Sequence, residues 1–467
     1  MLRKLRSRFE SAFIGASILL FALTACAASG ELHPVVEVEE DVYTFQPANN
    51  GAGPMWCFGN TCIVRHNDQV FVSTLHTLDG VKPLNNCVPA VWSRGADGWR
   101  ETYRSDGRTR EPCPLGTFAD GTILLSENRT TTPVDVYSGP AKPSILALDA
   151  ARAAAQPTHL APQWQGVPRF TEHSYRSLAV DRQNREMVLL QNIDYTHAEW
   201  SFYDRNGKWS SQGKLEWPRT SDGKPIRTCY PAVALKDRKV FFFGVSDIVE
   251  PNREWLNYKR EITGREWDYV FRRLYFTWSD DISTGKFHDW IEIANVESTA
   301  GSLFPNDLFV QENGDISLLW SATDIDARLR EKFFSNAVQR QALEYAVIRD
   351  GKILAKSSVV ESVEGSTGLQ PGRGRFHATS NGAAYVVFFV SGPDERGKAV
   401  HENRTALAGP NGLVGQSVSL KLKHPMSSFY TNTVRSGCSP SDTLDMFGQI
   451  GNTMRYAQIT LLSDVAN

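Results

Sequence analysis

The segment TEHSYRSL, residues 171–178, brings several chemically versatile side chains together at the start of an expected strand. They are Glu172, His173, Tyr175 and Arg176. Enzymes use histidine and tyrosine for general acid and base catalysis, and arginine binds carboxylates in a bidentate geometry. A single histidine at a strand end is also commonly a solvated or core-bonded residue, so the segment needs partners from elsewhere in the fold.

Two further residues are expected to join this group. His197, in the segment DYTHAEW, follows the next expected strand and is predicted to lie at the same end of the sheet as His173. Tyr230 begins a later strand immediately before Pro231, where core packing is its alternative role. Other polar residues at the starts of expected strands are Arg110, Glu111, Arg227, Asn306, Asp307, Arg375, His377 and Arg435.

The elements that must position these side chains are predicted to be strands. From residue 40 onward, short apolar or alternating runs recur between turn sequences, which is typical of an all-β protein. Hairpins come in pairs, such as CIVRHNDQVFVSTL followed by AVWSRGADGWRETY. The last pair lacks one strand, and VYTFQ at 42–46 is available to supply it. The pattern predicts a seven-bladed β-propeller of four-stranded antiparallel blades, closed by N- and C-terminal strands.

Long connections are expected on one face of this propeller. Turns inside each hairpin are tight, whereas the connections between the inner and outer hairpins are long at 74–87, 126–142, 246–270 and 321–342. In a propeller these connections share a face with the starts of the innermost strands. Since binding residues concentrate on loops, we expect the functional cavity on that face, lined by these four segments together with His173 and Tyr230.

The first residues have the layout of a secretory signal. Basic residues precede an apolar run, Ala12 to Leu23, that is too short to span a bilayer comfortably. The run ends in Leu-Thr-Ala-Cys at 23–26, which resembles the bacterial lipobox, and this resemblance implies lipidation of Cys26 and sorting to the outer membrane. We therefore expect a signal peptide at 1–25, a linker at 26–40 and the propeller at 41–467.

Charge and cysteine content limit the partners. The formal net charge is −2 and no basic run resembles a nucleic-acid footprint, so we expect no nucleic-acid partner. We expect a monomer without a cofactor. We also expect no metal ion, because no dense carboxylate cluster of the calcium type is visible. For Cys57, Cys62, Cys87, Cys113, Cys229 and Cys438, disulfides and buried free thiols both remain open, and both are favoured over zinc.

Two segments resemble the Asp-box turns of sialidase-type propellers. They are TWSDDISTGKFHDW at 277–290 and DRNGKW at 204–209, in degenerate form. Such turns are structural, because the aspartate accepts hydrogen bonds from the turn backbone. Residues 40–467 as a whole resemble the sialidase-like (BNR-repeat) propellers of exported bacterial proteins.

The set of histidine, tyrosine and arginine residues resembles the sites of propeller polysaccharide lyases, particularly the ulvan lyases. The resemblance implies β-elimination on a uronate-containing polysaccharide, with an arginine neutralising the carboxylate and histidine and tyrosine transferring the protons. By position, His173 and His197 correspond to the paired histidines and Tyr230 to the tyrosine. The expected substrate-binding residues are Tyr175, Arg176, Arg253, Trp255, Lys259 and Arg272, and Arg265, Trp267 and Tyr269 are further candidates.

Two other functions remain open at this point. A sialidase-like glycoside hydrolase would need two carboxylates, for which Glu111, Glu172, Asp247 and Asp307 are candidates, and an arginine triad drawn from Arg110, Arg176, Arg375 and Arg435. A non-catalytic glycan-binding lipoprotein is the other alternative, because a propeller fold does not by itself imply activity.

Overall fold

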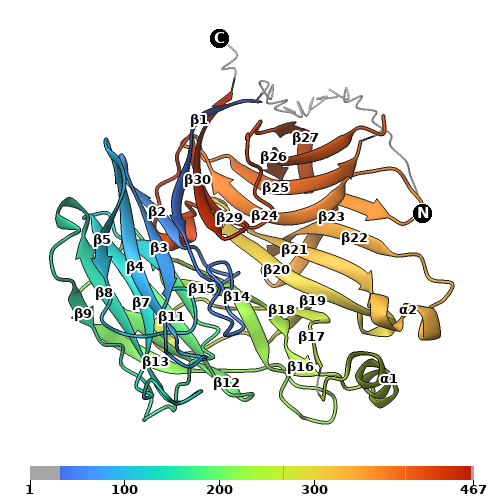
Figure 1. Ribbon diagram of the computed structural model, residues 1–467, viewed down its shortest axis with the longest axis horizontal. Coiled ribbons are helices and arrows are strands. Elements are labelled where there is room, and N and C mark those ends of the chain that lie inside the picture. Colours follow the sequence, from blue (N-terminus) through green and yellow to red (C-terminus); the bar gives the residue numbers. More distant parts are fainter. Residues whose placement is uncertain (1–31, 267, 395, 464–467) are drawn as a thin grey trace, which may run out of the picture.

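A computed structural model describes residues 32–266, 268–394 and 396–463 of the chain. Seven four-stranded antiparallel sheets follow one another in this part of the chain, which confirms the predicted seven-bladed β-propeller. Figure 1 shows the sheets succeeding each other in sequence order around the molecule. The predicted signal peptide, Cys26 and Trp267 lie outside the described residues.

Each blade is built from four strands that follow one another from the innermost position to the outermost. Blade 1 contains β2 (Ile63–His66), β3 (Gln69–Thr77), β4 (Cys87–Gly95) and β5 (Gly98–Arg104). Blade 2 contains β6 (Leu115–Thr117), β7 (Thr122–Thr130), β8 (Ala141–Asp149) and β9 (Thr158–Leu160). Blade 3 contains β10 (Ser177–Asp181), β11 (Glu186–Ile193), β12 (His197–Tyr203) and β13 (Trp209–Glu216). Blade 4 contains β14 (Thr228–Lys236), β15 (Lys239–Ser246), β18 (Arg273–Ser279) and β19 (Ile291–Asn295).

Blade 5 contains β20 (Ala300–Val310), β21 (Ile316–Ile325), β22 (Arg340–Arg349) and β23 (Lys352–Val363). Blade 6 contains β24 (Gln370–Ala378), β25 (Ala384–Pro393), β26 (Ala399–Gly409) and β27 (Gly412–Ser419). Blade 7 contains β28 (Phe429–Thr431), β29 (Thr443–Ile450), β30 (Thr453–Ser463) and β1 (Leu32–Thr44).

The hydrophobic core consists of seven layers, one between each pair of neighbouring blades. Successive residues of a strand point to opposite faces of the sheet, so each blade contributes to two layers. Phe242 packs between blades 3 and 4, for example, whereas Phe243 packs between blades 4 and 5. This two-sided burial explains why many central strands are apolar runs with little alternation.

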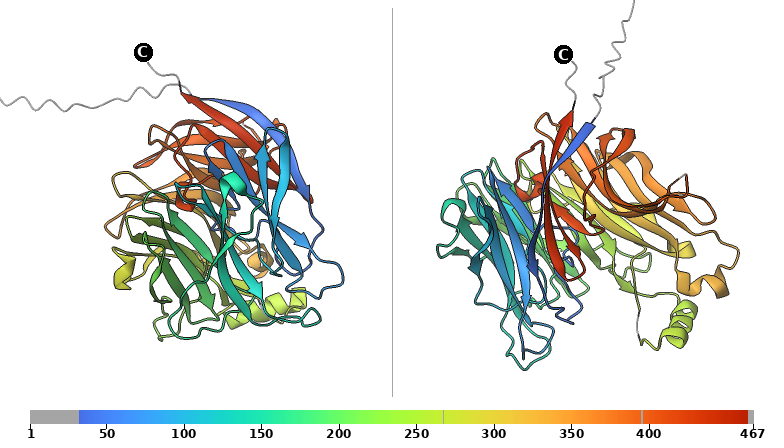
Figure 2. Two further views of the ribbon diagram at one scale, coloured as in Figure 1. Left: turned by 90° about the vertical axis from the view of Figure 1, so that its left-hand side faces the viewer. Right: turned by 45° about the horizontal axis from the view of Figure 1, so that its top comes forward.

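Strand β1 closes the ring, as the sequence predicts. It pairs antiparallel with β30, with Tyr43 opposite Met454 and Leu32 opposite Ser463, and Figure 2 shows the two strands side by side. The predicted linker at 26–40 is wrong from Leu32 onward, because residues 32–40 form most of β1. Their alternating exposed and half-buried side chains are those of an edge strand.

Two faces of the propeller differ in their loops. The long-loop face carries the connections from the second to the third strand of each blade and from each outer strand to the next blade, and the tight-turn face carries the remaining turns. Asp204 and Asp281 lie in two of these turns and accept hydrogen bonds from turn amides, which is the structural role expected for them. Both ends of the described chain leave blade 7 at its tight-turn end.

Helices occur in two of the long connections, where the sequence predicts only loops. Helix α1 (Arg253–Thr263) begins after Asn252, which caps its first amides, and ends before Gly264 at a φ of 68°. Helix α2 (Ala327–Phe333) contacts it from blade 5. Both lie at one edge of the molecule in Figure 1, beside the short strands β16 (Ile248–Val249) and β17 (Tyr269–Val270). No described helix is long and apolar enough to cross a membrane.

The central channel is filled from both ends. On the long-loop side, the segment at 45–62 crosses between β1 and β2, and the Asn60 side chain bonds the backbone of Arg176 and Leu178 on blade 3. On the tight-turn side, the loop at 432–442 enters the channel, where Arg435 contacts Asp307 at 2.8 Å. Because the crossing segment covers the channel mouth, its side chains become part of the long-loop face.

Candidate active site

A cavity of about 530 Å³ opens on the long-loop face. Its walls come from the segments that precede β10 and β14, from the ends of β11 and β15, and from the crossing segment. It is lined by Gly51, Trp56, Arg110, Thr171, His173, Tyr175, Asn192, Asp194, Tyr195, Arg227, Tyr230, Asp247, Tyr269 and Phe271. The predicted residues His173, Tyr175 and Tyr230 are therefore brought together.

His173 lies in the connection that leads into β10 and exposes 43% of its side chain. Its Nδ1 atom lies 3.3 Å from Oε1 of Glu172, which is itself buried and accepts a hydrogen bond from the Gly139 amide. Burial alone would raise the pKa of Glu172, but the hydrogen bonds from His173 and the Gly139 amide lower it below its usual value. A charged carboxylate thus orients the imidazole, and Nε2 is left for chemistry in the cavity.

Tyr175 and Tyr230 form the floor of the cavity with their rings 5.0 Å apart. Both residues have left-handed backbones, with φ of 41° and 51°, which is rare for bulky side chains and is found mainly at functional sites. Tyr230 occupies a bulge in β14, where the register shifts between Cys229 and Ala232. Burial raises the pKa of both phenols, so both hydroxyls stay protonated at neutral pH.

Arg227 supplies a cation at one wall of the cavity. Its guanidinium pairs with Asp247 at 2.7 Å and lies 4.1 Å from the ring centroid of Tyr195. The hydroxyl of Tyr195 is hydrogen-bonded to that of Tyr269, whose pKa rises to about 12 through burial and this bond. The two tyrosines and the aspartate fix the arginine, so it offers a rigid group to an anionic ligand.

Arg110 supplies a second cation to the cavity lining. Its guanidinium lies 5.1 Å from the ring centroid of Trp56, and its Nε donates to the backbone carbonyl of Asn50. Glu111 lies 3.9 Å from Nη1, but that carboxylate is hydrogen-bonded to Ser174. The positive charge of Arg110 is therefore weakly compensated compared with that of Arg227.

Two predicted residues of blade 3 do not line the cavity. His197 is held by Glu199 at 2.9 Å and by Thr196, so it is a paired strand residue and does not partner His173. Arg176 is fully buried, where it contacts Glu111 at 3.4 Å and the Pro112 carbonyl. Its assignment to substrate binding is wrong, because a buried guanidinium bonded in this way cannot reach a ligand.

The basic residues predicted in the 246–270 segment and beyond it also lie away from the cavity. Lys259 and Arg272 are both buried against Glu250. Lys259 lies 2.8 Å from its carboxylate, and Arg272 donates two hydrogen bonds to it, so the structure contradicts a role for either residue in substrate binding. Arg253 is exposed on α1 outside the cavity lining. Trp255 stacks on Arg272 at 5.1 Å and lines a neighbouring hollow of about 500 Å³.

Several expected mouth residues lie inside the channel. Asp307 and Arg435 form a buried ion pair, and Arg375 donates to backbone carbonyls. His377 is buried near the opposite end, where it contacts the Ser441 carbonyl. Of the arginine triad considered for a sialidase-like hydrolase, Arg110 alone lines the cavity.

The long connections contribute unequally to the cavity. Segment 246–270 supplies Asp247 and Tyr269, whereas 74–87, 126–142 and 321–342 supply no lining residue, contrary to expectation. The cavity occupies only the sector of blades 2 to 4 because the crossing segment covers the middle of the face. Sequence reasoning missed two lining residues. Trp56 belongs to the crossing segment, and Tyr195 belongs to the short turn between β11 and β12.

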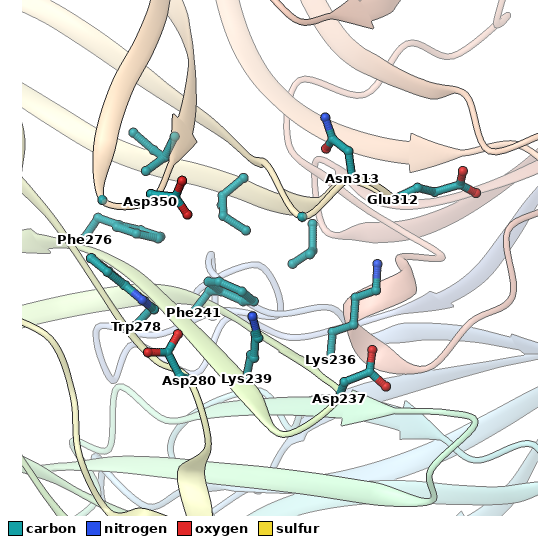
Figure 3. A pocket seen from close by; sticks show the side chains of 15 residues that line it. Lys236, Asp237, Lys239, Phe241, Phe276, Trp278, Asp280, Glu312, Asn313 and Asp350 are labelled. Carbon is teal, nitrogen blue, oxygen red and sulfur yellow. The ribbon is translucent and has the colours of Figure 1, made fainter.

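A smaller hollow of about 280 Å³ lies on the tight-turn face between blades 4 and 5. Figure 3 shows Lys236, Lys239, Asp280, Glu312 and Asp350 around it. These charged groups are exposed at turn tips, and the Trp278 ring is covered by His288 at 4.1 Å. The hollow therefore lacks the buried, oriented groups that distinguish the cavity on the long-loop face.

Among residues 32–463, as far as they are described, no group of three or more His, Cys, Asp or Glu residues is arranged to hold a metal ion.

The six cysteines of this part of the chain are buried free thiols. Of the two states that the sequence left open, disulfides and free thiols, the structure has the free thiols.

The fold and this site define a seven-bladed β-propeller whose long-loop face holds a cavity lined by histidine, tyrosine and arginine side chains. No protein-family model and no curated protein matches the sequence. An ulvan lyase of polysaccharide lyase family PL25, bound to GlcA(1-4)Rha3S, is similar in fold, with 11% identity, a TM-score of 0.53, and coverage of 91% of this chain and 96% of that one.

Two further solved structures have the same fold. One is an ulvan lyase of the same description without the sugar, with 11% identity, a TM-score of 0.52, and coverage of 91% of this chain and 96% of the other. The other is a polysaccharide lyase with 12% identity, a TM-score of 0.52, and coverage of 93% and 100%. At these identities the similarity shows the fold alone.

Proposed function

We propose that the protein is a polysaccharide lyase that cleaves a uronate-containing polysaccharide by β-elimination. The observation that carries the proposal is the meeting of His173, Tyr175, Tyr230 and two arginines in one cavity. Solved neighbours in fold are polysaccharide lyases, one of them bound to a sugar that contains glucuronate, and this supports the same substrate class here.

His173 is the base in this proposal. Elimination removes the proton from C5 of the uronate, moves the C5–H electron pair into a C4–C5 double bond, and releases the oxygen at C4. A neutral imidazole with Nδ1 directed to a carboxylate has Nε2 available as the acceptor. Glu172 stabilises the imidazolium formed in this step, because its carboxylate lies 3.3 Å away.

Tyr230 is the acid that protonates the leaving oxygen. Its pKa is raised by burial, so the phenol carries its proton at the pH at which a histidine is neutral. Tyr175 lies between it and His173, 6.5 Å from the imidazole centroid, and contacts the bound sugar. The left-handed backbone of both tyrosines holds the two residues in the cavity lining.

Arg110 neutralises the uronate carboxylate, which makes the C5 proton more acidic. It suits this role better than Arg227, because Asp247 already compensates the charge of Arg227 at 2.7 Å. Arg227 then fixes the orientation of the sugar as the second cation of the cavity. Hydrolysis is less well supported, because two of its four candidate carboxylates, Glu111 and Asp307, are buried in hydrogen bonds and ion pairs.

We further propose that the protein is exported and anchored to the outer membrane through Cys26. This part of the proposal rests on the leader sequence and on the lipobox-like residues 23–26.

Incubation with a panel of uronate-rich polysaccharides tests the reaction. Elimination creates a conjugated alkene that absorbs in the ultraviolet, whereas hydrolysis creates reducing ends without that absorbance. We expect both signals to rise together on at least one polymer. Reducing ends without the alkene would replace the lyase with a hydrolase, and neither signal on any uronate polymer would reject the enzymatic assignment.

A further inference from the structure

Arg373 carries a positive charge that the chain does not neutralise. It lies near the start of β24, the innermost strand of blade 6, and its guanidinium sits between the rings of Phe58 and Phe304, at 4.5 and 4.3 Å from their centroids. No described carboxylate lies within ion-pairing distance of it, and its Nη1 atom is buried without a hydrogen bond.

Two other buried arginines have acidic partners, whereas Arg375, also buried, donates to backbone carbonyls. Arg227 pairs with Asp247 at 2.7 Å, and Arg435 pairs with Asp307 at 2.8 Å. Burial of an unpaired charge is costly, and here burial and the nearby Arg375 lower the pKa of Arg373 to about 10, which leaves it cationic at neutral pH. A cation kept at such a position is suited to a counter-ion that arrives from outside.

Bulges hold both Tyr230 and Arg373. The innermost strands of blades 4, 5 and 6 each lose register, at 229–232, 305–307 and 371–374, and the first and last of these shifts lie near the long-loop ends of their strands. A bulge redirects a side chain out of the ladder. Arg373 and Tyr230 occupy two of these bulges, so both reach the region covered by the crossing segment.

An aromatic strip connects Arg373 to the cavity. Tyr230, which lines the cavity, lies 4.9 Å from Phe304 and 5.9 Å from Phe58, and these two phenylalanines flank the guanidinium. All three rings are partly exposed on the long-loop face. Aromatic faces are suitable supports for pyranose rings, so a sugar chain can follow the strip from His173 to Arg373.

We propose that Arg373 is a second anion subsite, which binds an acidic substituent on a sugar unit adjacent to the one held at His173. The substituent is an oxyanion, either a sulfate ester or a carboxylate, and Phe58 and Phe304 support the ring that carries it. The identity of the ligand as a glycan rests on the proposed function, whereas anion binding at Arg373 does not.

Binding measured in a catalytically silent background separates the two ideas. In His173→Ala protein, Arg373→Gln should weaken calorimetric binding of an acidic oligosaccharide at least about tenfold. The matched control is Arg404→Gln, which removes an arginine of the same blade that pairs with Glu402, and it should leave the affinity unchanged. Desulfated and carboxyl-reduced oligosaccharides identify the group, because the one that lacks it should bind equally well with and without Arg373.

Inorganic sulfate provides a probe that does not depend on a glycan. At constant ionic strength, sulfate should raise the unfolding temperature of the parent protein, and Arg373→Gln should abolish the increase. Equal binding of sulfate and of every oligosaccharide in the parent and Arg373→Gln proteins would overturn the subsite. Arg373-dependent binding without an alkene product would uphold the subsite and reject the lyase.

Stability distinguishes a subsite from a structural arginine. Arg373→Met keeps an unbranched side chain between the two phenylalanines and removes the unpaired charge, so its unfolding midpoint without ligand should equal or exceed that of the parent. A large fall in that midpoint would show that Arg373 serves the fold, and would overturn the proposal.

Discussion

The imidazole Nδ1 of His173 lies 3.3 Å from Oε1 of its neighbour Glu172. Because the carboxylate orients the ring and stabilises its protonated form, Glu172→Gln should lower kcat about 10- to 100-fold, and His173→Ala at least about 100-fold. The double variant should be no slower than His173→Ala, because the glutamate acts through the histidine. Alkene formation gives the rates and circular dichroism checks folding. Full activity of Glu172→Gln would contradict this coupling.

Tyr230 and Tyr175 should differ in their kinetic effects. Tyr230→Phe removes the proton donor and should lower kcat at least about 100-fold with little change in KM. Tyr175→Phe removes a contact to the bound sugar and should act mainly on KM. Steady-state kinetics on the best polymer measures both. If both His173→Ala and Tyr230→Phe retained full activity, the elimination mechanism would be wrong.

Glu250 should be a major determinant of stability. It is buried between Arg272 and Lys259. Glu250→Gln removes the carboxylate that pairs with Arg272, whereas Lys259 keeps its pair with Asp268, and the change should cost about 3–5 kcal/mol in urea unfolding. The control Glu361→Gln breaks a half-exposed pair with Arg340 and should cost about 0–1 kcal/mol.

The effect of Glu250 should also depend on pH. Burial alone would raise the pKa of Glu250, but Arg272 and Lys259 outweigh it and lower the pKa below the usual value of 4.5. A carboxylate with a lowered pKa stabilises the fold above its unfolded-state pKa and loses that contribution as the pH falls. The difference between parent and Glu250→Gln should be complete at pH 7 and shrink below about pH 4.5. A constant difference down to pH 3 would be incompatible with this account.

The six thiols should be silent in the native protein. Burial raises the pKa of Cys62 and Cys438 to about 11 and that of Cys57 and Cys87 to about 12, and the thiolate is the reactive form. A chain that begins at Leu32 should therefore give no reaction with a disulfide reagent at pH 8 and six equivalents after unfolding without reductant. A smaller count after unfolding would reveal disulfides.

Lipidation can be tested at Cys26 alone. Cys26→Ser should abolish acyl labelling in the bacterial host and release the protein from the membrane fraction, because the acyl chains provide the anchor. Persistent labelling of the variant would disprove the site. Cys438→Ser, a buried position, should leave labelling intact.

Much of the propeller can be predicted from sequence because its signals are local. Tight turns and apolar runs identify the hairpins one at a time, and the unpaired VYTFQ segment identifies the closing strand. The start of β1 was missed because Val36 and Val38 alternate with Glu37 and Glu39, a pattern shared by edge strands and solvated linkers. Helix α1 was missed although Asn252 and Gly264 are good capping residues.

The candidate site was only partly predictable, for a different reason. His173, Tyr175 and Tyr230 stand at the starts of innermost strands, and that position identified them. Arg176 stands there too, but its partner Glu111 is distant in sequence, and residue type cannot distinguish a buried ion pair from a free cation. Trp56 enters the cavity through a segment that crosses the channel, which no periodicity reveals.

The termini of the described chain have a consequence for an anchored protein. Leu32 and Ser463 are paired at the tight-turn end of blade 7, on the side opposite the cavity. With lipid on Cys26, the six residues that precede β1 extend at most about 20 Å. The tight-turn face of the protein would then lie close to the membrane, and the cavity would face away from it. A long polymer would reach the cavity from the surrounding medium without having to pass between the protein and the membrane.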